Sequence, residues 1–354
     1  GGGTNVTGSG TITTATDQIS GIDLSGLGDG TITLSVTLTD TNGNVGSAAT
    51  DTEAKDTGAP AGYSVVFDQS AANNGNETAI SFTFASAEVG ATYNYTISSS
   101  GGGTNATGSG TIATTTDQIT GIDVSGLSDG TLTLSVTLTD AAGNTGTEAT
   151  DNVEKDVVIP SGYSVSMDLL GESFINVINV SIIEFSGSGL EAGTTLNYTF
   201  SSDGGGTPVT GTETVTSSSE TFDNGGIGYD LSGLTDGTVT LTISLTDDAG
   251  NTGSDATATA TKDADPPAGY TVSWDEALIN TAEASTASFT VSNAEIGTTI
   301  NNSISSSGDG NTATVSNPIT VTSTTQVVTI DVSSLDDGVL TVEVSLTDAG
   351  GNTG

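Results

Sequence analysis

The sequence predicts an all-β protein made of small sandwich domains in tandem. Apolar and polar residues alternate with period two in short stretches bounded by Gly, Asp and Asn, a pattern typical of strands and turns. The same stretches recur at intervals of about 100 residues. No segment carries a helical apolar pattern of useful length. The chain of 354 residues is therefore expected to consist of repeated β domains.

Three phrases define the repeat. GGGTNVTGSGTI at Gly1 returns as GGGTNATGSGTI at Gly101 and, in degenerate form, as GGGTPVTG at Gly204. LTDTNGNVG recurs as LTDAAGNTG, LTDDAGNTG and LTDAGGNTG, starting at Leu38, Leu138, Leu245 and Leu346. A Gly-Tyr pair followed by alternating residues stands at Tyr63, Tyr163 and Tyr270.

The domain boundaries follow from a proline after Lys-Asp, because proline suits a linker or the first residue of a strand. The markers are KDTGAP, KDVVIP and KDADPP, which start at Lys55, Lys155 and Lys262. We expect residues 1–59 to be the C-terminal half of a repeat and 60–159 a complete repeat. Residues 160–266 form a complete repeat with an insertion, and 267–354 a repeat that lacks its last strand.

The second repeat contains about seven predicted strands, which is the count of an immunoglobulin-like sandwich. The expected strands cover residues 63–67, 78–84, 92–98, a middle stretch around 110–115, 118–124, 131–139 and 147–154. Disorder is the alternative for a chain rich in Gly, Thr, Ser and Asp. The periodic Val, Ile, Leu, Tyr and Phe oppose it.

Composition restricts the function. The chain has 43 acidic residues, three lysines, no Arg and no His, with a net charge of -40. This excludes nucleic acid and anionic membrane surfaces as direct partners, because both require a basic footprint. The absence of Cys and His removes the common nucleophile and base pairs, so the chain is not expected to be an enzyme. No apolar run is long enough to span a bilayer, so no membrane insertion is expected in this segment.

The sandwich topology predicts which acidic residues meet. The loops after the second and sixth strands lie at the end where a domain begins, beside the linker from the preceding domain. Each junction then gathers an Asp of the linker, a Glu of the first loop, and an Asp and an Asn of the second. The three sets are Asp56, Glu88, Asp140 and Asn144; Asp156, Glu191, Asp247 and Asn251; and Asp263, Glu295, Asp348 and Asn352.

Calcium takes six to eight oxygen ligands of the kinds these residues carry. The sequence therefore predicts a Ca²⁺ ion at each junction. The alternative is that Asp and Asn stand there because they cap tight turns. Turn capping is the favoured explanation for Asp29, Asp129, Asp236 and Asp337, which precede or lie near Gly, and a second ion is a weaker possibility at Asp68, Asp168 and Asp275.

The phrases AEVG (87–90) and LSDGTLTLSVTLTDAAGN (127–144), with Lys-Asp before Pro160, resemble the bacterial immunoglobulin-like repeats of giant adhesins and biofilm-associated proteins. Long motility-linked surface adhesins of gliding bacteria are a further relative. The resemblance covers nearly the whole chain. It departs in the Lys before each junction Asp and in the lack of Thr-Thr at most junctions. It implies interdomain calcium at the junction residues and a secreted, bacterial cell-surface location.

The function expected from these observations is an extender: domains stacked in a linear array hold a distal adhesive region, outside this chain, against a host or environmental surface. Two alternatives remain. The repeats themselves could bind a carbohydrate or a surface, most plausibly through the insertion around residues 171–189. Neighbouring chains could also assemble into a fibre by lateral pairing or strand exchange.

Overall fold

The computed structural model describes residues 2–308, 312–313 and 318–354. Within these residues every regular element is a β-strand and there is no helix, in agreement with the sequence pattern. In the same residues, no helical segment of the length and hydropathy needed to cross a membrane is present. The chain forms two compact units, residues 1–158 and 159–354.

The first unit begins with a two-stranded hairpin of β1 (Gly30–Val36) and β2 (Ala49–Lys55). The two strands pair antiparallel, with Gly30 opposite Lys55 and Val36 opposite Ala49. Apolar side chains of the hairpin remain exposed, Leu34 of β1 by 53% and Leu38, which follows β1, by 61%. Residues 1–59 thus supply strands but no closed core of their own.

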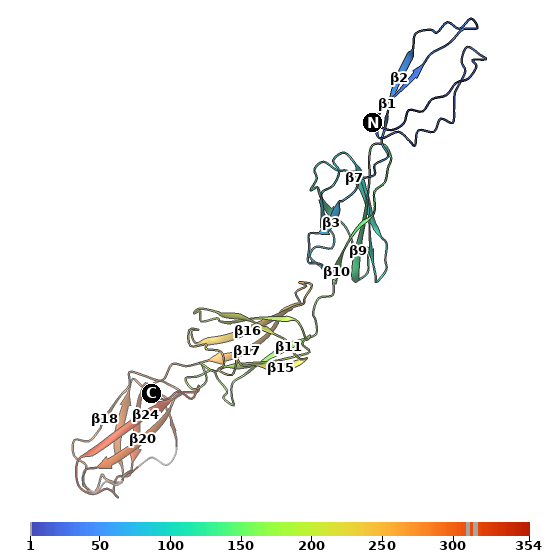
Figure 1. Ribbon diagram of the computed structural model, residues 1–354. Helices are drawn as coiled ribbons and strands as arrows, with labels where there is room; N and C mark the ends of the chain where they lie inside the picture. Colours follow the sequence, from blue (N-terminus) through green and yellow to red (C-terminus); the bar gives the residue numbers. More distant parts are fainter. Residues whose placement is uncertain (1, 309–311, 314–317) are drawn as a thin grey trace. The chain divides into compact units, whose positions relative to one another are not determined.

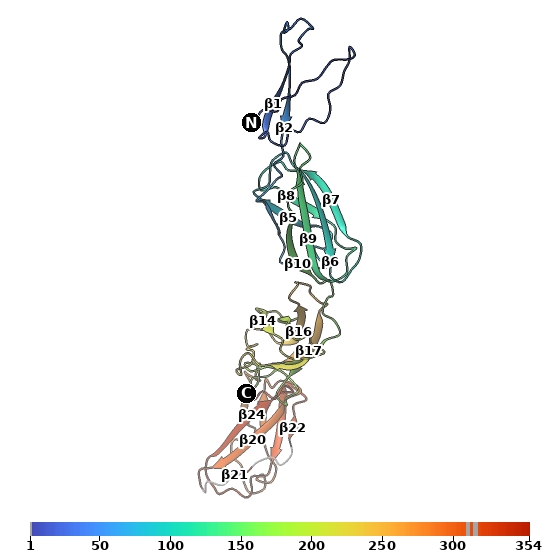
Figure 2. The same ribbon diagram turned by 45° about the vertical axis from the view of Figure 1, so that its right-hand side comes forward.

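The remainder of this unit is a β-sandwich of two sheets (Figures 1 and 2). Figure 2 shows β10, β9, β6 and β7 side by side in the larger sheet. The smaller sheet contains β3 (Ser64–Phe67), β5 (Ile80–Ala85) and β8 (Gln118–Ile122). The larger sheet has the order β4 (Ala71–Ala72), β10 (Ala149–Lys155), β9 (Gly130–Thr139), β6 (Thr92–Ser99) and β7 (Ala106–Thr111). This arrangement of short strands confirms the immunoglobulin-like sandwich.

The core of this sandwich comes from alternate residues of facing strands. Phe82 and Phe84 of β5 are buried and pack edge-on at 5.5 Å between ring centroids, against Leu132, Leu134 and other inward residues of β9. Strict alternation along β9 places apolar side chains inward and Thr or Ser outward.

One predicted strand is displaced. The middle stretch expected around 110–115 lies at β7, residues 106–111. Glycines, which are depleted in strands, make β7 hard to recognise, yet a Cβ on Gly108 or Gly110 would lie 2.5–2.6 Å from the ring of Tyr95 or Tyr93. The glycines are therefore part of the strand because the tyrosine rings of β6 cover them.

The second unit contains two further sandwiches. In the first, β11 (Ser164–Asp168), β12 (Glu184–Ser188) and β15 (Ser219–Phe222) face a sheet of the order β14 (Val209–Thr214), β13 (Thr195–Ser202), β16 (Gly237–Thr246) and β17 (Ala256–Lys262). Phe185, Phe200 and Tyr229 fill its core. Phe185 lies 5.9 Å from Phe200 and 5.3 Å from Tyr229, measured between ring centroids.

In the second of these sandwiches one sheet holds β18 (Thr271–Trp274), β19 (Ala287–Ser292) and β23 (Thr325–Ile330). The other holds β20 (Thr299–Ser306), which pairs with β21 (Thr312–Ala313), β22 (Ile319–Thr320) and β24 (Leu340–Thr347). Phe289, Ile304 and Leu346 are fully buried in its core. The boundaries proposed after residues 59, 159 and 266 stay a prediction, with which three separate cores are compatible.

The tyrosine of each Gly-Tyr pair fastens the start of a sandwich to the hairpin that ends it. The Tyr63 hydroxyl accepts a hydrogen bond from Leu138 N at 3.2 Å and donates to Thr147 O. Tyr163 makes the same two bonds with Leu245 N and Ser254 O. The rings were expected to pack at the domain edge, and their hydroxyl groups in addition make these hydrogen bonds.

Candidate metal centres

The first junction lies within the first unit, at the loop between β9 and β10. Asn144 N donates to Asp140 Oδ1 and Asn144 Nδ2 to Asp140 Oδ2, both at 2.8 Å. Gly143, with φ of 95°, supplies the left-handed residue that the turn requires. Hydrogen bonds, chiefly from the Asn144 side chain, lower the pKa of Asp140. Asp140 and Asn144 therefore make the hydrogen bonds of a capped turn.

The same Asn144 amide also reaches the preceding linker. Its Nδ2 donates to the backbone oxygen of Asp56 at 3.2 Å, so that this nitrogen lies between a carboxylate oxygen and a carbonyl oxygen. The Asp56 carboxylate is exposed and accepts Gly58 N at 3.0 Å, and Glu88 is exposed in the loop between β5 and β6. The predicted topology therefore brings Asn144 to the linker, while two of the carboxylates face solvent.

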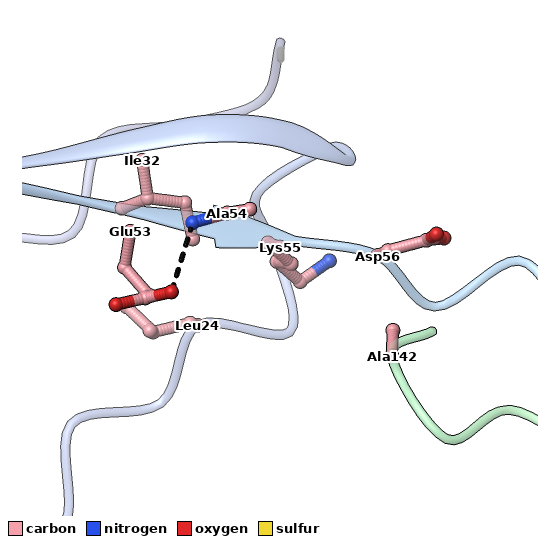
Figure 3. A pocket seen from close by; sticks show the side chains of 7 residues that line it. All are labelled: Leu24, Ile32, Glu53, Ala54, Lys55, Asp56 and Ala142. Carbon is pink, nitrogen blue, oxygen red and sulfur yellow. Dashed lines mark hydrogen bonds between the residues drawn. The ribbon is translucent and has the colours of Figure 1, made fainter. Parts of the chain in front are cut away.

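Figure 3 shows the surface beside this junction, where Asp56 follows β2 and Ala142 belongs to the turn. The pocket there is lined by Leu24, Ile32, Glu53, Ala54, Lys55, Asp56 and Ala142. Glu53 Oε1 accepts the backbone N–H of Ala54 at 3.3 Å, and the Asp56 carboxylate points away from Glu53. The polar groups of this pocket do not converge on one point.

The last junction, inside the second unit, repeats the turn in a buried setting. Asn352 N donates to Asp348 Oδ1 at 2.8 Å, and Asn352 Nδ2 donates to Asp348 Oδ2 at 3.0 Å and to the backbone oxygen of Asp263 at 2.8 Å. Asn352 is fully buried. Burial, with the charges of Asp348, Asp236, Glu295 and Asp265, raises the pKa of Asp263. Three members of the predicted set, Asp263, Glu295 and Asp348, therefore interact electrostatically here.

Among the described residues, no group of three or more acidic side chains is drawn together closely enough to hold a metal ion. The carboxylates at the last junction are near enough to repel one another, yet they do not form a closed cage. The metal-ligand assignment of all twelve residues stays a prediction.

The middle set divides between the two units, since Asp156 belongs to the first and Glu191, Asp247 and Asn251 to the second. Asp156 Oδ1 accepts Val158 N at 2.9 Å within its own unit. Asn251 bonds both oxygens of Asp247 at 2.8 Å, as in the other turns. The hydrogen-bonded turn is thus common to the three repeats, and the ion predicted for this set remains untested.

A residue that the sequence reasoning missed contributes to the last junction. Asn176, in the loop after β11, donates from Nδ2 to Gly350 O at 2.8 Å, and Val177 N donates to Asn352 Oδ1 at 3.0 Å. Alignment of the repeats contains the signal, because Asn73, Asn176 and Asn280 recur at equivalent places, each three residues before Asn or Glu. Asn176 lies in the insertion predicted as a possible ligand-binding segment, and it bonds Asn179 of its own loop as well as Gly350 of the next repeat.

Gly350 stands where the two complete repeats have Ala142 and Ala249. A Cβ at residue 350 would lie 2.9 Å from both Asp263 Oδ2 and Asn352 Nδ2. The glycine therefore allows the linker carboxylate to approach the turn closely at this junction.

The acids near the turn before β9 and its equivalents do more than cap turns. Asp29, Asp129 and Asp236 pair with Lys55, Lys155 and Lys262, with nitrogen to oxygen distances of 3.1, 3.6 and 2.5 Å. Asp129 also accepts Val157 N at 3.2 Å, and Asp236 accepts Ala264 N at 2.9 Å. These acids fix the first residues of the linker.

The acids considered for a second ion have hydrogen-bond donors from the protein. Asp68 accepts the hydroxyls of Ser81 and Thr83 and the amide of Gln118, and Asp275 accepts Ser288 and Thr290. Asp168 accepts Leu170 N at 2.8 Å. Each of the three acids therefore has a hydrogen-bond donor within its own repeat, and the second ion stays a prediction.

No protein-family model matches the chain, and no curated protein matches it. Among solved structures, it is similar to a tetra-tandem repeat in the extending region of a large adhesion protein. The identity is 24%, the match covers 95% of this chain and 82% of that one, and the TM-score is 0.30.

Two further similar structures are bacterial adhesins. One is a Ca²⁺-stabilized adhesin with which an Antarctic bacterium binds ice (23% identity, 92% and 79% coverage, TM-score 0.36). The other is a 1.5-MDa ice-binding adhesin (21% identity, 84% and 95% coverage, TM-score 0.35). The first structure is a tandem repeat of a large adhesion protein and the other two are bacterial adhesins, the class that the sequence resembles. Because the TM-scores lie below 0.5, the sandwich assignment rests on the strand pairing described above.

Proposed function

We propose that this chain is part of the extracellular extender of a bacterial surface adhesin, and that Ca²⁺ binds at its repeat junctions and stiffens them. The observation that supports this most directly is the repeated contact between a turn and the preceding linker. Asn144 donates to the Asp56 carbonyl and Asn352 to the Asp263 carbonyl, each while held by its own Asp. Successive repeats thus meet through an oxygen-rich set that recurs with the repeat.

The chemistry of this set suits calcium. Carboxylates, side-chain amide oxygens and backbone carbonyls are hard oxygen donors of the kind that Ca²⁺ accepts in flexible geometry. The Asn144 Nδ2 atom lies between Asp140 Oδ2 and Asp56 O, where a positive group is favourable. A half-turn of the Asn144 amide would present Oδ1 instead, and the exposed carboxylates of Asp56 and Glu88 could then turn inward.

Charge provides the driving force. With a net charge of -40, the chain repels itself unless salt or bound cations offset the excess. At one junction, burial and, after it, repulsion from neighbouring acids raise the pKa of Asp263. A divalent cation would relieve this repulsion where the acids are crowded, and the linker would lose freedom to hinge.

The test uses the intact chain in chelator, in millimolar CaCl₂ and in millimolar MgCl₂. We expect calcium to raise the melting temperature and to increase the maximum dimension in small-angle scattering, with less effect from magnesium, which prefers strict octahedral sites. Asp56→Asn removes one carboxylate but keeps the backbone oxygen, and should reduce calcium binding measured by calorimetry. Asp51→Asn, on exposed β2, is the matched control. Unchanged melting and dimensions in calcium would refute the clamp.

A further inference from the structure

In the two complete repeats a short segment that follows the first strand makes a parallel contact with the last strand. In the repeat starting at residue 60, β4 pairs parallel with the end of β10, Ala71 opposite Glu154 and Ala72 opposite Lys155, and Asp156 N donates to Ala72 O at 3.0 Å. In the next repeat Ile175 pairs parallel with Lys262, and Ile175 N and Asp263 N make bonds of 2.9 Å to Thr261 O and Ile175 O. The other strand pairs of these sheets are antiparallel.

The parallel direction decides how tension would act on this contact. The chain enters the repeat ahead of β4 and leaves it after β10. A pull on the two chain ends therefore drives β4 and β10 in opposite directions along their length. All the hydrogen bonds between them are then loaded together, whereas strands pulled from the same end would separate one bond at a time.

A buried lysine stabilises the same pairing of β4 with β10. Lys155, opposite Ala72, has a side chain that is 2% exposed, and its Nζ lies 2.8 Å from Glu77 Oε2 and 3.6 Å from Asp129 Oδ1. Glu77 stands in the turn between β4 and β5, so the ion pair joins the last strand to the first part of the repeat. Lys262, opposite Ile175 and 6% exposed in its side chain, pairs with Asp236.

The placement of the cations supports a specific role. The chain has three basic residues against 43 acidic ones, and all three occupy this one repeat position. Removal of one partner from a buried ion pair leaves an uncompensated charge, which is strongly destabilising. The lysine therefore opposes the first movement by which the last strand could slide or detach.

We infer that the parallel contact of β4, or of the segment at Ile175, with the last strand, together with its buried lysine, is the element that bears mechanical load in each complete repeat. The inference rests on the proposed extender function only in that an extender carries tension. The resistance itself is a property of a repeat, and it is measured without reference to calcium or adhesion. Failure of the calcium clamp would leave it standing.

Single-molecule pulling on the full chain tests the geometry. Because the chain has no cysteine, pairs of introduced cysteines define the points of attachment. Ala61→Cys with Val157→Cys loads β4 and β10 in shear, and Asn74→Cys with Val157→Cys pulls both strands from the same end. Forced unfolding reports the unfolding rate, and we expect a shear force several-fold above the peeling force. Equal forces in the two geometries would overturn the inference.

The lysine is tested in the same two geometries. Lys155→Met should lower the shear force and leave the peeling force unchanged, which a general loss of stability would not do. Lys55→Met is the matched control, because in the described residues β2 pairs with β1 alone and has no parallel partner. If Lys155→Met fails to fold, Glu77→Gln removes the ion pair and keeps the side-chain shape. An unchanged shear force in the variant that folds would refute the role of the lysine.

Discussion

Residues 1–59 and 101–159 have nearly the same sequence and both form the last hairpin of a repeat, but only the second segment is buried. GTITLSVTLTD and GTLTLSVTLTD both form a strand, and Gly30 opposite Lys55 matches Gly130 opposite Lys155. Leu34 is 53% exposed, and Leu134 is fully buried in a core that includes Phe82 and Phe84 of β5. Hairpin formation therefore follows local sequence, while burial depends on strands that residues 60–99 provide.

The turn at the end of the hairpin also differs between the two segments, in what it contacts. Asp40 and Asn44 make the same hydrogen bonds as Asp140 and Asn144, at 2.9 Å and 2.8 Å. In the first case no linker contact accompanies the turn among the described bonds, and in the second Asn144 reaches Asp56. The turn is thus a local structure. The feature that favours a cation at Asp140 is the contact of Asn144 with the Asp56 linker.

The largest expected difference concerns the core. Leu134→Ala should lower the free energy of unfolding of its repeat by about 2–5 kcal/mol, because it removes a fully buried side chain and leaves a cavity. Leu34→Ala should change it by less than about 0.5 kcal/mol, as for other exposed positions. Urea denaturation of the full chain, followed by aromatic fluorescence, measures both. A comparable loss in Leu34→Ala would mean that residues 1–59 are buried in solution by another segment.

The next largest effect concerns calcium, which we expect to bind at the turn of Asp140 and not at the turn of Asp40. At a concentration a hundred times Kd, a cation bound only to the folded state adds about 2.7 kcal/mol of stability. We expect Asp140→Ala to abolish the calcium-dependent rise in melting of the first unit and to free only the junction at Asp56. Asp40→Ala loses the same turn bonds and is therefore the control. Equal calcium responses in the two variants would contradict a site at Asp140.

The sequence was sufficient for the features that repeat or alternate. It predicted the sandwich, most strands of the second repeat, and the meeting of the Asn144 turn with the Asp56 linker, because these depend on period and topology. It misplaced β7, predicted around 110–115, because the glycines of this strand are required by the rings of Tyr93 and Tyr95 and give no apolar alternation. It also did not reveal Asn176, because a loop that crosses to another repeat has no signal in local alternation.

The smallest effect is expected at the buried junction, where the turn of Asp348 and Asn352 contacts Asp263. Burial and the charges of Asp348, Asp236, Glu295 and Asp265 raise the pKa of Asp263 above its ordinary value. The folded state then holds the proton more firmly than the unfolded state. Its stabilising contribution is complete below the ordinary pKa of about 3.9 and is lost as the pH rises through the raised value.

In chelator, Asp263→Asn should therefore raise the melting temperature of the second unit at pH 7, since it removes the repulsion and keeps the backbone oxygen that Asn352 contacts. The difference from the unaltered chain should shrink as the pH approaches about 4, where Asp263 becomes protonated. Comparison at each pH cancels the opposite trend of Asp236, whose pKa is lowered by its bond with Lys262 and the linker amides despite burial.

Calcium should reverse the sign of this difference in melting temperature, because the Asp263 carboxylate of the unaltered chain then has a cation to bind. Calorimetric melting at the two pH values, with and without calcium, measures this. A variant that melts below the unaltered chain at pH 7 in chelator would show that Asp263 is stabilised there by contacts other than a cation.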